Sequence, residues 1–153
     1  MRRGFPRLAM AAGLLFFAQA PSAWACSCSG NPDFYAVARH APVLVRAVVL
    51  EHKSIAVGYR PNLVTHIEVR VLDVLTGVVP NDRILIAGDV GNLCRPYVSG
   101  FAVGTEWFFV LSPRAALHGD VPEFAISICG THWMRATDDT RDAIAAKIRE
   151  NLK

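Results

Sequence analysis

Two cysteines separated by one residue, Cys26-Ser27-Cys28, most constrain how this 153-residue chain can fold. They follow a stretch with the three parts of a secretory signal peptide: a basic start, an apolar run over residues 8–20 and small residues before the first cysteine. We therefore expect residues 1–25 to be removed. Cleavage there would make Cys26 the amino terminus of a secreted or periplasmic protein.

An alternative is a membrane-anchored lipoprotein acylated at Cys26. A lipoprotein signal usually has Leu three residues before the cysteine, where this chain has Ala23, and the bulky Trp24 fits that signal poorly. The apolar run at 8–20 is also shorter than the roughly 20 residues that span a bilayer. The sequence thus favours a cleaved leader, followed by one domain over residues 26–153.

The charges of the expected mature domain balance. Three of the sixteen Lys and Arg residues lie in the leader, so thirteen basic residues face thirteen acidic ones in the remainder. No basic stripe with interleaved aromatic residues is present, so nothing indicates nucleic-acid binding. The later apolar runs have strand length, and no transmembrane segment is expected in the mature chain.

The chain has four cysteines, Cys26, Cys28, Cys94 and Cys129, and in a secreted domain an even number indicates disulfides. A bridge between Cys26 and Cys28 would close a very small, strained ring. We therefore expect each to pair with one of the two distant cysteines, in either order. The spacing suits neither a zinc site nor the C-x-x-C redox motif.

The rest of the chain predicts a mainly β protein. A short helix is expected over 33–40, with Asn31 as its cap and Pro32 at its first position, and a second helix over 138–152 with a stripe of apolar residues. Five segments are β-prone or alternate in polarity: 43–51, 63–75 (with a bulge near Leu72–Asp73), 83–87, 106–111 and 123–129. Five strands with flanking helices predict a small closed barrel of the OB-fold type.

With these features, the chain resembles the tissue inhibitors of metalloproteinases and the wider netrin-like module. The resemblance is carried by the C-x-C terminus after a signal peptide and by the aromatic helix Phe34-Tyr35-Ala36. It continues in the valine-rich strand at 43–49, a loop cysteine at Cys94, the apolar strand at 107–111 and a strand ending at Cys129. It covers essentially all of the expected mature chain.

The resemblance implies an OB-fold barrel with the pairing Cys26–Cys94 and Cys28–Cys129. It also implies inhibition in trans, in which the α-amino nitrogen and carbonyl oxygen of Cys26 chelate the catalytic zinc of a protease. Ser27 would enter the primary specificity pocket, and Cys28 with Ser29 would run along the cleft. The six residues implied for this inhibitory wedge are Cys26, Ser27, Cys28, Ser29, Asn92 and Leu93.

Other residues suggest no chemistry of their own. The five histidines lack metal-ligand spacing, and the serines lack a nucleophile-elbow context. Arg95-Pro96-Tyr97 is a candidate loop for partner contact. We expect no catalysis and no cofactor, and the possible partner is a zinc metalloprotease. The competing hypothesis is a disulfide-bonded interaction module of the cell envelope without inhibitory activity, either free or lipid-anchored at Cys26.

Overall fold

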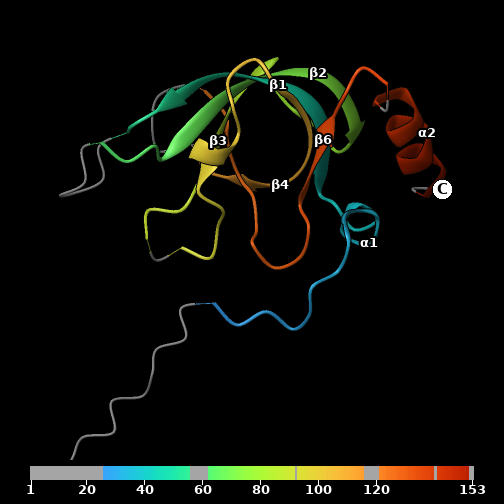
Figure 1. Cartoon of the computed structure of the whole chain (residues 1–153), viewed down its shortest axis with the longest axis horizontal. Helices are drawn as coiled ribbons and strands as arrows, with labels where there is room; N and C mark the ends of the chain where they lie inside the picture. Colours follow the sequence, from blue (N-terminus) through green and yellow to red (C-terminus); the bar gives the residue numbers. More distant parts are fainter. Residues whose placement is uncertain (1–25, 56–61, 92, 116–120, 140, 152–153) are drawn as a thin grey trace, which may run out of the picture.

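The computed structural model describes residues 26–55, 62–91, 93–115, 121–139 and 141–151, and its strands curl into a closed barrel (Figure 1). The predicted signal peptide, Asn92 and Leu152 lie outside these residues. The elements are α1 (Phe34–Ala38), β1 (Val43–Lys53), β2 (His66–Thr76), β3 (Arg83–Ala87), the 3₁₀ turn η1 (Val98–Gly100), β4 (Glu106–Arg114), β5 (Glu123–Ala125), β6 (Trp133–Ala136) and α2 (Arg141–Asn151).

Five strands close the barrel in the order β1-β2-β3-β5-β4, and β4 returns to pair with β1. The pair β3–β5 is parallel, and the other pairs are antiparallel. The closing pair runs from Val43 opposite Leu111 to Val48 opposite Glu106. The predicted fold class, a five-stranded OB-fold-like barrel with a short helix near its start and a helix at its end, is confirmed.

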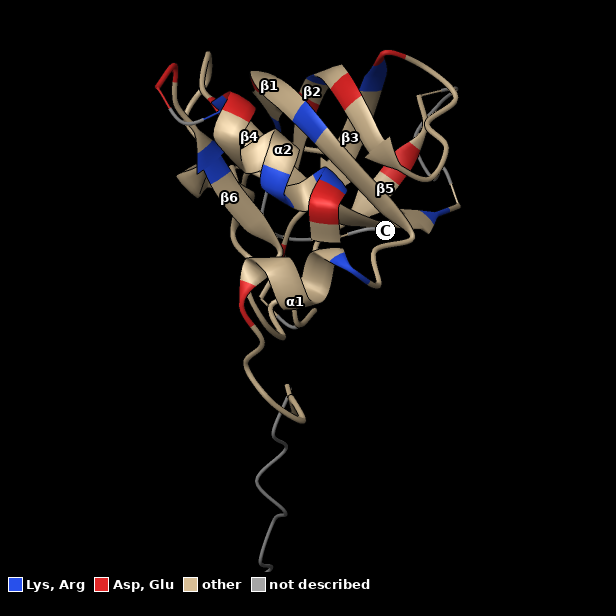
Figure 2. Cartoon of the chain, turned by 90° about the vertical axis from the view of Figure 1, so that its right-hand side faces the viewer, with Lys and Arg blue, Asp and Glu red and all other residues tan. Residues whose placement is uncertain are grey.

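Strands β1 and β4 are buried on both faces because the barrel lies on one side and the helices on the other. Alternate residues such as Val45 and Phe109 point into the barrel, where both are fully buried. Their neighbours Leu44 and Phe108 pack outward against α1 and α2, which Figure 2 shows on one side of the molecule. Near-continuous apolar runs are typical of strands covered in this way.

Both helices depart from the predicted boundaries. The cap of α1 is Asp33, whose carboxylate oxygen accepts a hydrogen bond from the amide of Ala36 at 2.8 Å. The prediction of Asn31 as cap and Pro32 as first helical residue is therefore wrong, because an acidic side chain two residues after Asn31 satisfies the helix amide. Helix α2 begins at Arg141, and a turn takes the place of the predicted first residues.

The apolar stripe of α2 is interrupted by Lys147, and the structure gives this residue a partner. Its ammonium group lies 4.2 Å from the ring centroid of Tyr35 on α1. A lysine over an aromatic face gains a cation–π attraction while its stem covers apolar surface. Lys147 therefore belongs to the contact between the two helices.

The predicted strand over 123–129 is wrong in extent and hides a second strand. Only Glu123–Ala125 forms β5, and the chain then leaves β4 before returning to it as β6. Ile126 still points into the core, but Ile128 is 45% exposed. The alternation of apolar and polar residues continues past the end of β5, although the chain there leaves the sheet. It leaves because Cys129 is bonded to Cys28 outside the barrel.

The bulge predicted in β2 is confirmed. Val71 lies opposite Ala47 and Asp73 lies opposite Arg46, so Leu72 between them has no partner in β1. An extra residue on one strand bends it and increases its twist. The bulge allows the second half of β2 to curve around the barrel toward α2.

The turn after β2 depends on Gly77, which has φ +80° and lies against the start of β1. A Cβ atom there would stand 2.2 Å from the carbonyl oxygen of Pro42. Gly104 also has φ +80°, but a Cβ atom there would have nothing within 4 Å. The two glycines therefore separate the cost of a left-handed backbone from the cost of a steric clash.

We expect Gly77→Ala to lower the free energy of unfolding by at least about 3 kcal/mol, since backbone strain and a clash add. Gly104→Ala should cost only about 1 kcal/mol. Denaturant unfolding of the two oxidised variants measures both values. Equal losses would contradict the close approach of Gly77 to Pro42.

Candidate functional site

The segment before α1 is an extended run in which every residue from Cys26 to Asp33 is exposed. Two disulfides tie it down: Cys26 to Cys94, with Cα atoms 5.4 Å apart, and Cys28 to Cys129, with Cα atoms 5.3 Å apart. This is the pairing that the resemblance implies. In Figure 1 the segment passes beneath the barrel, where the loops that carry the partner cysteines descend to it.

The loop that carries Cys94 is closed at its base and braced inside. The amide of Asp89 donates to the carbonyl of Pro96 at 3.0 Å. The side-chain oxygen Oδ1 of Asp89 accepts from the amides of Gly91 and Leu93, the latter at 3.2 Å. These bonds hold the loop in one shape and place Leu93, which is 36% exposed, one residue before the disulfide.

The loop that carries Cys129 joins both other segments. The amide of Ile128 donates to the carbonyl of Cys94 at 3.2 Å, and the amide of Thr131 donates to the carbonyl of Pro32 at 2.9 Å. Gly130 lies so close to Pro32 that a Cβ atom there would stand 2.8 Å from the proline ring. The amino-terminal segment and the two loops therefore form one cross-linked unit.

Three large apolar side chains are exposed on these two loops or where they end: Leu93 at 36%, Tyr97 at 56% and Ile128 at 45%. Leu93 and the loop containing Tyr97 are predicted from the sequence, whereas Ile128 is not. Ile128 precedes Cys129, and this position could have indicated its exposure. A cysteine bonded to an exposed segment lies near the surface, and so do its neighbours in the sequence. These side chains give the cross-linked unit apolar contact area beside Cys26 and Cys28.

Arg95, directly after Cys94, is half-buried. Burial lowers the pKa of its guanidinium, and the positive charge of Arg114 lowers it further, while Glu123 and Asp89 act in the opposite direction. The guanidinium therefore lies in a charged setting at the base of the Cys94 loop.

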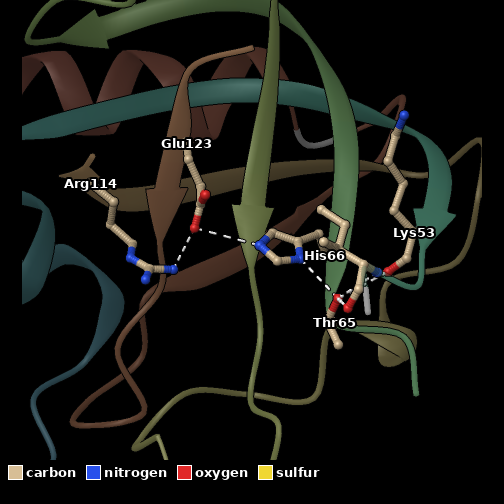
Figure 3. A network of polar contacts seen from close by, with 6 residues as sticks. Lys53, Thr65, His66, Arg114 and Glu123 are labelled. Atoms are coloured by element: carbon tan, nitrogen blue, oxygen red, sulfur yellow. Dashed lines mark hydrogen bonds and ion pairs between the residues drawn. The ribbon is translucent and has the colours of Figure 1, made fainter. Parts of the chain in front are cut away.

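A buried polar network lies on the outer side of β2, β3 and β5 (Figure 3). Glu123, whose side chain is 1% exposed, accepts a hydrogen bond from the guanidinium of Arg114. The Nε2 atom of His66 lies 3.5 Å from the same carboxylate oxygen, and its Nδ1 atom lies 2.9 Å from the hydroxyl of Thr65. No local motif in the sequence marks this chain of contacts, since its members come from distant segments.

A hydroxyl, an imidazole and a carboxylate in series have the composition of a nucleophile with its base. Here the hydroxyl is not available for attack, because Thr65 is 1% exposed and its oxygen accepts the amide of Ile55 at 3.0 Å. The network instead links the start of β2 to β5 and to the end of β4. Its role in the described structure is to satisfy buried polar groups.

We expect Glu123→Gln to lower the free energy of unfolding by about 2 kcal/mol. The change removes the buried negative charge that contacts the guanidinium of Arg114 and the imidazole of His66. Glu106→Gln is the matched control. Glu106 pairs with Arg46 and Arg141, but its side chain is 28% exposed, so its loss should cost less than about 1 kcal/mol. Denaturant unfolding compares them, and equal costs would contradict the role of burial.

Among the residues that the structure describes, no cluster of three or more His, Cys, Asp or Glu side chains could hold a metal ion. Within the same residues, no helix is long and apolar enough to cross a membrane. Acidic and basic residues are interspersed along the ribbon in Figure 2. Comparison of the chain with protein-family models and with curated proteins gave no match.

Proposed function

We propose that this chain is a secreted or periplasmic TIMP-like inhibitor that binds zinc metalloproteases through Cys26 as the first residue of its mature form. The observation that carries the proposal is that the segment from Cys26 to Asp33 is exposed throughout, yet held by two disulfides. An exposed strand fixed in this way suits insertion into a cleft. The apolar side chains of Leu93 and Ile128 would flank the inserted strand.

The chemistry of the terminus fits a catalytic zinc site, which keeps one coordination position open for water. After cleavage before Cys26, the free amine and the carbonyl oxygen of this residue would replace that water as a bidentate ligand. An α-amino group has a pKa of about 8, so a useful neutral fraction exists near neutral pH. The disulfides reduce the ordering cost of binding, because the segment is already held in place.

The remaining residues of the proposed wedge take their roles from the resemblance. Ser27 would point into the primary specificity pocket, and Cys28 with Ser29 would extend along the cleft. Asn92 and Leu93 would form the second edge of the wedge through the disulfide at Cys94. The braced shape of the Cys94 loop supports this part of the proposal.

The first experiment is a mass measurement of the protein secreted with its own leader, followed by inhibition assays on a panel of zinc metalloproteases. The proposal expects a chain that begins at unmodified Cys26 and inhibits at least one member of the panel. A longer amino terminus, or a diacylglyceryl group on Cys26, would contradict it, because either would block the amine.

A second candidate function is a non-inhibitory interaction module of the cell envelope. The exposure of Tyr97 and Ile128 favours it, since these side chains can contact a partner without any free amine at Cys26. An unmodified Cys26 without inhibition of any protease would favour this candidate. An acylated Cys26 would favour its lipid-anchored form.

A further inference from the structure

The two disulfides differ in what else holds the chain beside them. Among the described residues, those from Cys26 to Asn31 make no hydrogen bond and no ion pair, so the disulfides alone fix this part of the segment. Cys26 is the first of these residues, and under the proposed function it is also the first residue of the mature chain. The Cys26–Cys94 bond therefore has an anchor on one side only, which is the neighbouring disulfide at Cys28.

The Cys28–Cys129 bond, in contrast, lies between two anchors. On one side, the amide of Thr131 donates to the carbonyl of Pro32 at 2.9 Å and joins the two segments a few residues beyond the bond. On the other side lies the neighbouring disulfide. If the Cys28–Cys129 bond opens, both anchors keep its two sulfur atoms close together, so the bond closes again readily.

The loop that carries Cys94 is held in shape by contacts other than its disulfide. The amide of Asp89 donates to the carbonyl of Pro96, and the carboxylate of Asp89 accepts amides inside the loop. The carbonyl of Cys94 accepts the amide of Ile128 at 3.2 Å, which joins the two cysteine loops. An open Cys26–Cys94 bond would therefore release Cys26 and leave the loops in place.

We propose that the Cys26–Cys94 disulfide is a redox switch, which a dithiol reductant opens before the Cys28–Cys129 disulfide. A thiolate of the reductant attacks the Sγ atom of exposed Cys26, and the sulfur of half-buried Cys94 leaves and takes up a proton. The second thiol of the reductant then attacks the reductant sulfur of the mixed disulfide. This step releases Cys26 as a thiol and oxidises the reductant to a disulfide, so two electrons and two protons pass to the two cysteines.

The consequence of this switch for inhibition rests on the proposed function. With the bond closed, Cys26 is held in place before a protease binds, which keeps the ordering cost of binding low. With the bond open, Cys26 and Ser27 extend freely from Cys28. Reduction would thus weaken inhibition while the second disulfide preserves the fold, and reoxidation would restore inhibition.

The order in which the disulfides open can be measured without a protease. The oxidised protein, secreted with its own leader, is equilibrated in mixtures of reduced and oxidised dithiothreitol, alkylated and digested. Mass spectrometry then gives the reduced fraction of each cysteine pair. We expect the Cys26–Cys94 pair to be half reduced at a ratio of reduced to oxidised dithiothreitol at least about tenfold lower than the second pair needs, a difference of about 30 mV.

Two substitutions at one exposed position test the anchor beside the second disulfide. Thr131→Pro removes the amide that donates to Pro32, whereas Thr131→Ala keeps it. The proline variant should make the Cys28–Cys129 pair easier to reduce, and the alanine variant should leave both ratios unchanged. The order of opening in the unsubstituted chain decides the proposal even if the proline variant does not fold.

The release of Cys26 has a readout of its own. In the protein with only the Cys26–Cys94 pair reduced, the NMR order parameter of the Ser27 amide should fall below about 0.6, whereas the amides of α1 should keep their values. The inhibition constant against a protease that the oxidised protein inhibits should rise at least about tenfold.

Four results would overturn the proposal. The first is reduction of both pairs at the same ratio, and the second is reduction of the Cys28–Cys129 pair before the other. The third is a Ser27 amide as rigid after reduction as before it, and the fourth is unchanged inhibition by the singly reduced protein. If the oxidised protein inhibits no protease, the proposed function fails, and the order of opening and the Ser27 amide still decide whether reduction releases Cys26.

Discussion

Under the proposed function, one alanine added before Cys26, in a chain that otherwise begins there, is expected to abolish inhibition of zinc metalloproteases. The addition converts the α-amino group into a peptide nitrogen, which is a poor metal ligand, and places a residue where the zinc would lie. We expect the inhibition constant to rise more than about a hundredfold, which corresponds to about 2.7 kcal/mol. Titration of each form against the most sensitive protease of the panel measures the change.

The matched control for this experiment is an alanine added after Lys153, at the opposite end of the sequence. It changes chain length and composition equally, and it should leave inhibition unaltered. Thermal unfolding of both forms should agree, because Cys26 stays bonded to Cys94 in each. Unchanged inhibition by the amino-terminal extension would contradict zinc chelation by the terminus.

Joint replacement of Cys28 and Cys129 by serine is expected to lower the free energy of unfolding by about 4–5 kcal/mol. The disulfide joins residues 101 positions apart, and release of so long a loop restores much conformational freedom to the unfolded chain. A domain of this size is stable by about 5–15 kcal/mol, so the loss is a large part of the total. Urea unfolding of both proteins measures it.

Ser27→Ala and Ser29→Ala are the controls for the disulfide variant, since both residues are exposed in the same segment. Each should change the free energy of unfolding by no more than about 0.5 kcal/mol. If the disulfide variant loses less than about 1 kcal/mol of unfolding free energy, the Cys28–Cys129 bond does not stabilise the fold by restricting the unfolded chain. Its effect would then be limited to the local segment.

The barrel could be predicted from the sequence because its strands have strong local patterns. The run from Val43 to Val49 is β-branched and apolar, as a strand covered on both faces requires. The bulge at Leu72 was predictable for the same reason, since the alternation in β2 slips by one residue there. β3 has the predicted boundaries because a turn precedes Arg83 and glycine follows Ala87.

The boundaries of β5 and β6 could not be predicted, because they depend on a contact between distant residues. Cys129 must leave the sheet to reach Cys28, and local alternation through Ile126 and Ile128 contains no trace of this. β6, Trp133–Ala136, is short and has no clear alternation. Its pairing with β4 after the loop determines where it begins.

The part of the candidate site that is held by disulfides could be predicted from the sequence. The part that depends on packing between distant segments could not. The C-x-C motif alone indicated that Cys26 and Cys28 would be tied to distant parts of the chain. The contact of His66 with Glu123 joins residues 57 positions apart, and no local motif marks it. The one available sign was an acidic residue in a segment otherwise suited to burial.

The interruption between β5 and β6 has a consequence for how such a protein can change over time. Both strands pair with β4, so the register of the sheet is set before the chain leaves it and again after it returns. The pairing of the barrel strands therefore does not determine the length of the stretch between them, which carries Ile128 and Cys129. Insertions or a grafted sequence at 127–128 would therefore change the exposed surface beside Cys129 while the hydrophobic core remains the same.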